Sequence, residues 1–212
     1  MSKLKLCAVL IAALNCGLSA AAAEPAAAIQ PAYTQGNDYR QLAPERQKTA
    51  VNEVSEFFSF WCYHCKAFNA QMRDIAAELD GTVPVKLYPV DFGDAGSHAA
   101  QIGYFYALKH GKGQKYLDVM FALIHEGRVD IKNPEQIASV INLIDLDGMD
   151  FLKHRNDAEF TTESAKVEDL LTRYDINAVP ELVVNGKYIP QIFKYESTED
   201  KVGLLRYLST MP

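Results

Sequence analysis

Cys62 and Cys65 are the residues whose type and spacing are best suited to chemistry. They follow an apolar run and open a stretch with helical spacing, and His64 lies between them. At a helix N-terminus, unpaired backbone N–H groups and the positive end of the helix dipole stabilise a thiolate, and a protonated His64 adds a second positive charge. The motif therefore predicts a reactive thiolate on Cys62 with a second thiol in reach, which is suited to disulfide exchange.

The second thiol has a different expected role. Cys65 lies one helical turn after Cys62 and should be more buried, so we expect it to be the resolving thiol. In the oxidised form, a substrate thiolate would attack the Cys62 sulfur and Cys65 would leave. A second substrate thiol would then depart with the new disulfide. Stabilising the Cys62 thiolate stabilises the reduced form, which makes the disulfide easy to donate.

Other uses of the cysteines are weaker. A structural zinc site needs four ligands; the chain has no second cysteine pair, and four further histidines lack ligand spacing and are expected at surfaces or interfaces (His98, His110, His125 and His154). A structural disulfide closing so short a loop would stabilise little. Metal binding by Cys62, Cys65 and His64 as soft ligands is the alternative from another class. The leading expectation is no metal, and no cofactor besides the disulfide.

Residues 1–23 have the pattern of a secretory signal peptide. Lys3 and Lys5 give a positive start, an apolar run follows, and cleavage is expected near Ala22 or Ala23. Residues 24–38 are interpreted as a flexible leader. A lipid anchor at Cys16 is disfavoured by the preceding asparagine.

Export changes the cysteine count. Of the 4 cysteines, Cys7 and Cys16 leave with the signal, so the mature chain keeps one pair. Exported proteins normally use cysteines in structural bridges, whereas this pair is free for chemistry. Removing two of the 21 basic residues leaves 19 against 27 acidic ones, a net charge of −8. This balance, without a basic run, argues against nucleic acid and anionic membrane surfaces as partners.

The apolar pattern predicts the elements that position the motif. Strands over 51–58 and 83–90 flank a helix over 64–79, and a short edge strand is expected over 39–42. Helical spacing without a strand pattern follows over 97–110, 112–126, 134–144 and 148–155. A helix over 158–174, a hairpin turning at Asn185-Gly186 and a helix over 198–210 close the chain. The order predicts an α/β fold, a discontinuous thioredoxin-like domain (39–93 and 158–212) with an inserted α-helical subdomain (94–157).

Two further positions are candidates for the site. Pro180 opens a strand although proline donates no ladder hydrogen bond; a cis bond would expose backbone groups of Val179 to an extended substrate, and a simple turn is the other interpretation. Glu56 lies in an apolar strand, where a charge is costly unless paired. If buried, it would have a raised pKa and accept the proton of Cys65; otherwise it points outward. Lys86 is a candidate partner whose face depends on the strand register.

Together these motifs resemble the DsbA-type thiol:disulfide oxidoreductases of the bacterial periplasm. The resemblance covers nearly all of the mature chain. It rests on 56–60 (Glu-Phe-Phe-Ser-Phe) leading into Cys62–Cys65, on the helical insertion, and on Val179-Pro180 followed by 184–188 (Val-Asn-Gly-Lys-Tyr). It implies that Cys62 is the nucleophile, Cys65 the resolving thiol and His64 the main tuner of the thiolate. It also implies that Pro180 is cis beside the disulfide and that Glu56 is the family's buried acid.

The resemblance implies a periplasmic dithiol oxidase that donates its disulfide to reduced, folding exported proteins. It implies recharging by a quinone-linked membrane protein of the DsbB type. We expect a monomer, with Trp61, Tyr63 and Val179 contacting substrate. Tyr63 stands where the family commonly has proline and Trp61 where phenylalanine is common, which bears on the redox poise and on the reoxidising partner.

A disulfide isomerase or reductase on the same fold is the runner-up. The usual isomerase design adds a dimerisation domain, and no such domain is expected before Tyr39.

Overall fold

The computed structural model describes residues 33–48, 51–79, 81–92 and 97–212, which belong to one compact unit. The expected signal peptide and the leader up to residue 32 lie outside the described residues. Within the described ranges, no helix is both long enough and apolar enough to span a bilayer.

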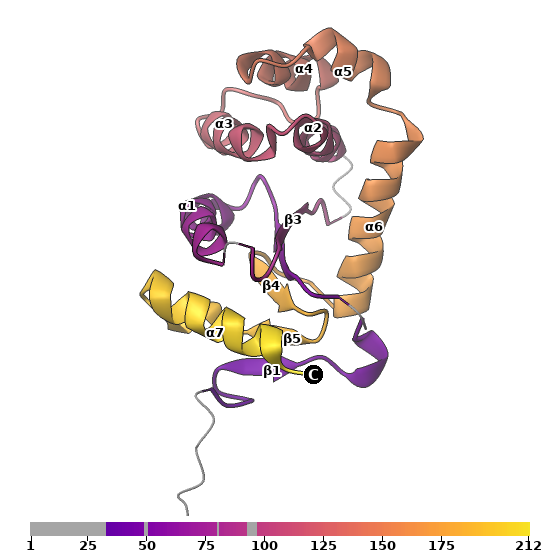
Figure 1. Cartoon of the computed structure of the whole chain (residues 1–212). Helices are drawn as coiled ribbons and strands as arrows, with labels where there is room; N and C mark the ends of the chain where they lie inside the picture. The colour runs from indigo at the N-terminus through magenta and orange to yellow at the C-terminus, as the bar shows by residue number, and fades with distance from the viewer. Residues whose placement is uncertain (1–32, 49–50, 80, 93–96) are drawn as a thin grey trace, which may run out of the picture. The chain divides into compact units, whose positions relative to one another are not determined.

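A five-stranded mixed sheet forms the centre of this unit, with the strand order β1-β5-β4-β2-β3 (Figure 1). Only β2 and β3 pair in parallel, while the other three pairings are antiparallel. The strands are β1 (Tyr39–Gln41), β2 (Val54–Phe58), β3 (Val85–Pro89), β4 (Glu181–Val184) and β5 (Tyr188–Pro190). All five residues of β2 are buried, because strands flank it on both sides and helices cover both faces.

The two faces of β2 are covered by different helices. Val54 packs in one apolar cluster with residues of α1 (Tyr63–Glu78) and α7 (Thr198–Thr210). Phe57, on the opposite face, meets the ring of Tyr174 at the end of α6 (Ala158–Tyr174), with ring centroids 6.1 Å apart. Figure 1 shows α1 and α7 on one side of the sheet and α6 on the other. This arrangement fixes where the start of α1, and with it Cys62, must lie.

Four helices between β3 and α6 form the helical block: α2 (His98–Lys109), α3 (Gly113–His125), α4 (Pro134–Leu143) and α5 (Gly148–His154). Figure 1 shows them stacked beyond the end of the sheet, with α2 and α3 nearest to it. Large aromatic and aliphatic side chains fill the block and join the core of the sheet in one cluster. The architecture is the expected α/β thioredoxin-like fold with an inserted helical region.

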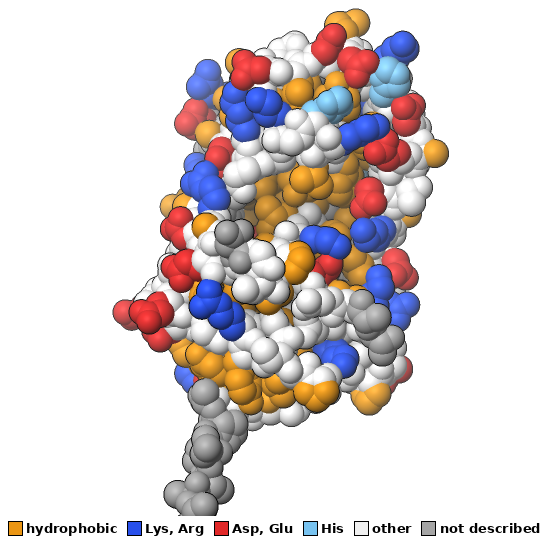
Figure 2. Space-filling view, viewed as in Figure 1, with side chains coloured by type: hydrophobic (Ala, Val, Ile, Leu, Met, Phe, Trp, Pro, Cys, Tyr) orange, Lys and Arg blue, Asp and Glu red, His pale blue; other side chains and the backbone are white. Residues whose placement is uncertain are grey.

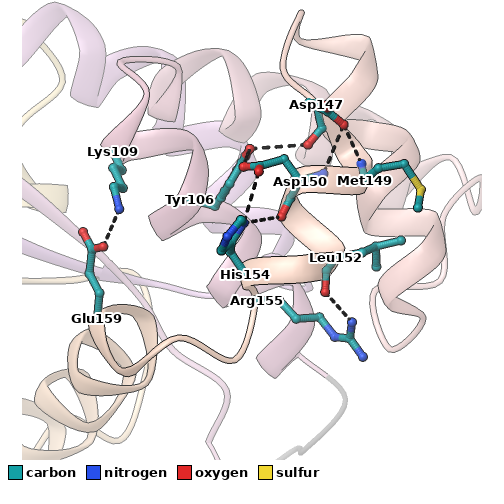
Figure 3. Close-up of polar contacts among 9 residues, drawn as sticks. All are labelled: Tyr106, Lys109, Asp147, Met149, Asp150, Leu152, His154, Arg155 and Glu159. Carbon is teal, nitrogen blue, oxygen red and sulfur yellow. Dashed lines mark hydrogen bonds and ion pairs between the residues drawn. The ribbon is translucent and has the colours of Figure 1, made fainter.

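Polar side chains link α2 to the later helices of the block (Figure 3). The Tyr106 hydroxyl donates to Asp150 Oδ2 at 2.9 Å, and His154 Nδ1 lies 3.1 Å from Asp150 Oδ1. Three residues later in α2, Lys109 Nζ contacts Glu159 Oε2 at 2.5 Å. These contacts hold α5 and the start of α6 against α2.

The sequence pattern located each of the regular strands and α-helices, with ends shifted by a few residues. The hairpin turns where expected: Asn185 and Gly186 both have positive φ, 52° and 64°. The pattern did not predict the two short 3-10 turns, Pro44–Arg46 and Ile192–Lys194.

The leader is shorter than the sequence suggested. Residues 33–38 pack onto the domain, because the buried Asp38 carboxylate accepts hydrogen bonds from Lys194 Nζ at 2.8 Å, from the Tyr195 hydroxyl at 2.6 Å and from the Thr34 N–H at 2.9 Å. Lys194 and then Tyr195 hold the pKa of Asp38 well below its usual range. A composition rich in small and polar residues gave no sign of these contacts.

Replacing this carboxylate should destabilise the fold. We expect Asp38→Asn to lower the free energy of unfolding at pH 7 by about 2 kcal/mol, the scale of hydrogen bonds to a charged group. Because the folded-state pKa of Asp38 is lowered, its stabilisation is present above its unperturbed value of 3.8 and is lost as the pH falls below it. Urea unfolding at pH 7 and in acid measures both effects.

Asp169→Asn is the matched control, because Asp169 forms an exposed ion pair with Arg173 at 3.8 Å. It should change stability by less than about 0.5 kcal/mol. Equal stability of the Asp38 variant and the parent at pH 7 would contradict this account of the N-terminal turn.

Candidate active site

The two cysteines meet where β2 ends and α1 begins. Cys62 is the N-cap of α1, and its Sγ accepts a hydrogen bond from the backbone N–H of Cys65 at 3.1 Å. Its own N–H donates to the Ser59 carbonyl at 3.1 Å, which closes the turn between strand and helix. A sulfur in this position lies against the free N–H groups and the positive end of the helix dipole, where negative charge is favoured.

The two thiols differ in their surroundings. Cys62 is half-buried, whereas Cys65 is 1% exposed. Burial raises the pKa of the Cys65 thiol well above its usual value, and the neighbouring Cys62 adds to this shift. Cys62 can therefore meet an external disulfide or thiolate, while Cys65 can react only with Cys62.

The Val179–Pro180 segment lies beside Cys62. Its peptide bond is cis, one of the two alternatives that the sequence left open. The Cys62 Sγ donates to the Val179 carbonyl at 3.5 Å, a contact between residues 117 positions apart. Val179 precedes β4 and is half-buried, so an extended chain bound here would meet both its backbone and the Cys62 sulfur.

Aromatic side chains border Cys62 in the sequence. Trp61 is 49% exposed and Tyr63 is 70% exposed, both unusual for such large apolar groups. The Tyr63 ring lies 6.2 Å from the His64 ring and 6.0 Å from the His125 ring, edge-on to both. His64 is exposed in the first turn of α1.

A shallow apolar depression, the α1 groove, runs from His64 along α1. Its volume is about 410 Å³. Its walls come from α1, from Pro180 and from an aromatic residue in the short turn that follows β5 (His64, Ala67, Phe68, Gln71, Pro180 and Phe193). Phe193 is 57% exposed, and its ring packs edge-on against Phe68 at 4.9 Å. The sequence did not identify Phe193, because it lies in a short turn that no periodic pattern marks.

Glu56 points inward. It lies opposite Leu87 of β3 and Leu182 of β4 and is 3% exposed. Burial raises the pKa of Glu56 to about 8, so the carboxyl is largely neutral at pH 7. Its charge would in turn raise the pKa of Cys65, which places the carboxyl near the resolving thiol.

The suggested partner of Glu56 was wrong. The register places Lys86 opposite Ser55, one position away from Glu56. Lys86 instead pairs with Glu53, with Nζ 2.6 Å from Oε2. A shift of one residue exchanges the faces of a strand, and the sequence alone left this register open.

His125 also contacts the active-site segment. This histidine ends α3, and its Nε2 lies 3.1 Å from the Phe60 carbonyl, two residues before Cys62. Sequence spacing gave no sign of this contact, because it depends on how the helical block packs on β2. Within the described residues, no cluster of three or more histidine, cysteine or acidic side chains could hold a metal ion.

Known proteins resemble this chain in sequence and in fold. Residues 53–203 match the family model of the DSBA-like thioredoxin domain. The chain is 28% identical over 180 residues to the thiol:disulfide interchange protein DsbA of Pseudomonas aeruginosa, covering 83% of this chain and 84% of that protein. A crystal structure of a DsbA variant from the same organism superposes with a TM-score of 0.73 at 26% identity, over 84% of this chain and 96% of that one.

A Proteus mirabilis DsbA solved with the non-covalently bound peptide PWATCDS shares the fold, with a TM-score of 0.70 at 19% identity, over 83% of this chain and 98% of that one. The family match spans more than half of the sequence and includes both cysteines, the helical block and the Val179–Pro180 segment. The chain therefore belongs to the family of DSBA-like thioredoxin domains.

Proposed function

We propose that this thiol:disulfide oxidoreductase works as an oxidase, donating the Cys62–Cys65 disulfide to reduced proteins that fold after export. The observation that carries the proposal is the asymmetry of the two thiols. One thiol is half-exposed and accepts a backbone hydrogen bond at a helix N-terminus, and the other is buried. This asymmetry stabilises the reduced pair with Cys62 as the thiolate, which favours giving the disulfide away.

The reaction begins when a substrate thiolate attacks the Cys62 sulfur of the oxidised pair. A substrate–Cys62 disulfide forms, the Cys62–Cys65 bond breaks, and Cys65 leaves as a buried thiolate. A second thiolate of the substrate then attacks the substrate sulfur of the mixed disulfide. The substrate disulfide forms, and Cys62 is released as a thiolate. Two electrons pass from the substrate thiols to the protein, and the burial of Cys65 requires that it take up a proton.

Several side chains have proposed roles in these steps. His64, adjacent to Cys62 and exposed, tunes the thiolate when it is protonated. Pro180 and Val179 hold the substrate backbone beside Cys62 Sγ, and Glu56 exchanges a proton with Cys65. Trp61 and Tyr63 offer exposed aromatic surface to an unfolded chain.

The α1 groove fits the apolar side chains of an unfolded substrate, because Phe68, Pro180 and Phe193 line it. Apolar contacts between the groove and a substrate would depend little on the substrate's sequence, which an oxidase acting on many proteins requires. The peptide bound non-covalently to the Proteus mirabilis relative supports peptide binding as a property of this fold.

The periplasm is the proposed location, since the N-terminal pattern is that of a signal peptide. After cleavage of that peptide, Cys62 and Cys65 would have no further cysteine with which to form a structural disulfide. Reoxidation by a quinone-linked membrane protein of the DsbB type would complete the cycle. Tyr63 lies at the surface next to Cys62, so it would meet both the substrates and this reoxidant.

Removing the resolving thiol should trap the substrate. We expect Cys65→Ser to accumulate a mixed disulfide through Cys62 when it meets an unfolded protein with disulfides, such as scrambled ribonuclease, because the variant lacks the Cys65 thiol that would attack the Cys62 sulfur and release the substrate. Mass spectrometry of the acid-quenched mixture measures the adduct. Cys62→Ser is the control and should form none, because Cys65 is buried. An adduct of equal yield through Cys65 would contradict the assigned order of the two thiols.

Glu56 should make stability depend on pH. Its folded-state pKa of about 8 lies above its unperturbed value of 4.5, so folding takes up a proton between these values and stability falls as the pH rises through that window. We expect Glu56→Gln to remove this loss. The variant should gain roughly 3 kcal/mol over the parent at pH 7, at about 1.4 kcal/mol per pH unit, and little at pH 4.5. Urea unfolding of the reduced proteins across this range measures the difference.

Glu53→Gln is the matched control, with the opposite sign. Burial raises the pKa of Glu53, but hydrogen bonds from Lys86, Ser55 and Tyr88 outweigh burial and lower it overall. Its replacement should therefore destabilise the protein at neutral pH. A pH-independent difference between Glu56→Gln and the parent would show that Glu56 is not a buried acid with a raised pKa.

A further inference from the structure

One face of α3 points toward α1 and toward the turn that precedes it. Asp118, Phe121 and His125 follow one another at helical spacing on this face. The Asp118 carboxylate accepts hydrogen bonds from Asn69 Nδ2 at 2.8 Å and from the Arg73 guanidinium at 2.7 Å. Both donors lie in α1, so these contacts join the middle of α1 to α3.

Further along the same face, α3 reaches the turn between β2 and α1. Phe121 packs against the ring of Phe60 with centroids 5.7 Å apart, and Phe60 is 1% exposed. His125, the last residue of α3, brings its Nε2 to 3.1 Å from the Phe60 carbonyl oxygen. The His125 ring also lies 6.0 Å from the Tyr63 ring. One imidazole therefore contacts the chain both before and after Cys62.

On another side, the helical block leaves a gap against the sheet. A depression of about 290 Å³ opens between β3, the α2–α3 pair and α6 (Val85, Lys86, Leu87, Tyr88, Tyr104, Phe105, Leu108, Gln114, Glu163 and Lys166). Figure 2 shows hydrophobic side chains lining a hollow below the α2–α3 pair. The block is thus open along the edge strand β3, and the later part of α3 joins it to the cysteine motif.

The atoms of the His125 contact determine where its proton lies. A backbone carbonyl accepts hydrogen bonds and donates none, so the proton between the two atoms belongs to His125 Nε2. Both the neutral Nε2–H tautomer and the imidazolium carry this proton. The bond therefore needs a donor at the Nε2 position and does not need a positive charge. His64 differs, since its proposed effect on the thiolate depends on its charge.

We infer that His125 is a positioning residue for Cys62: its Nε2–H holds the Phe60 carbonyl, and with it the turn that sets the Cys62 sulfur at the N-cap of α1. Two hydrogen bonds of this turn follow the held carbonyl. The Cys62 N–H donates to the Ser59 carbonyl and the Cys65 N–H donates to the Cys62 sulfur, both at 3.1 Å. His125 acts through these contacts and not on the sulfur itself.

The His125–Phe60 hydrogen bond matters more to the reduced form than to the oxidised one. Both cysteines are free thiols in this structure, so non-covalent contacts alone keep Cys62 beside the Cys65 N–H. In the oxidised form the disulfide itself ties the two residues together. Losing the bond should therefore destabilise the reduced form selectively. The inference rests on the proposed function, because a stabilised reduced form is what makes the pair an oxidant.

The test compares His125→Gln with His125→Asn, whose side chains end in the same amide and differ in length. Glutamine places its amide nitrogen near the position of Nε2, whereas asparagine places it near that of Nδ1. The measurement is the equilibrium constant for oxidation of glutathione by the disulfide. We expect His125→Asn to lower it about fivefold, which corresponds to about 1 kcal/mol for one hydrogen bond. His125→Gln should keep the parent's value, because it keeps the donor.

His154→Asn is the matched control, because His154 is another histidine of the helical block and pairs with Asp150 within that block (Figure 3). Its equilibrium constant should equal that of the parent. An unchanged constant in His125→Asn, or the same loss in His125→Gln or in His154→Asn, would overturn the inference. Urea unfolding that showed equal destabilisation of the reduced and oxidised forms of His125→Asn would also overturn it, since a merely structural contact has that effect.

The parent protein gives a test that needs no variant. Nitrogen NMR of the reduced protein, at a pH above the titration of imidazole, shows which ring nitrogen of His125 carries the proton. The inference requires the Nε2–H tautomer, and the Nδ1–H tautomer would contradict it.

Failure of this inference can be told apart from failure of the proposed function. The oxidase role is judged by the reduction potential of the parent protein. The role of His125 is judged by the difference between its variants and that parent. A parent with a reducing potential would contradict the oxidase role, and the predicted difference between His125→Asn and His125→Gln would still support the positioning role.

Discussion

The hydrogen bond from the Cys65 backbone N–H to the Cys62 sulfur joins the redox chemistry to the first turn of α1. It exists because β2 delivers Cys62 to the N-cap position, and β2 is held in place by strands on both sides and helices on both faces. The same geometry directs the next cysteine inward, one turn later, where burial disfavours its thiolate. One strand-to-helix junction thus gives two chemically identical thiols opposite properties.

The helical block contributes to this junction as well as covering the sheet. His125 contacts the carbonyl of Phe60 at 3.1 Å and lies against Tyr63, so α3 contacts the segment on both sides of Cys62. Tyr104 of α2 borders the face of β2 that carries Glu56. The helices inserted after β3 therefore pack beside the face of β2 that carries Glu56, while the α1 groove lies along α1 and beside Pro180.

The sequence predicted the features that depend on local pattern. Cys62 and Cys65 at a helix start, the Asn185-Gly186 turn and the helical spacing of the block all follow from residues close in the chain. Features set by packing between distant elements were missed or left open. The face of Glu56 and the pairing of Lys86 depend on a one-residue register. Phe193 and His125 reach the site from segments whose positions relative to β2 no local pattern encodes.

The central claim is that this junction makes the Cys62–Cys65 pair an oxidant, with Tyr63 between the cysteines where the sequence resemblance led us to expect proline. The reduction potential of the pair, measured by equilibration with glutathione, tests this claim most directly. DsbA itself, the best-known oxidant of this kind, lies near −120 mV, protein disulfide isomerase near −180 mV and thioredoxin near −270 mV. The account predicts a potential at or above about −180 mV. A value close to about −270 mV would contradict it and would favour a reductase on the same fold.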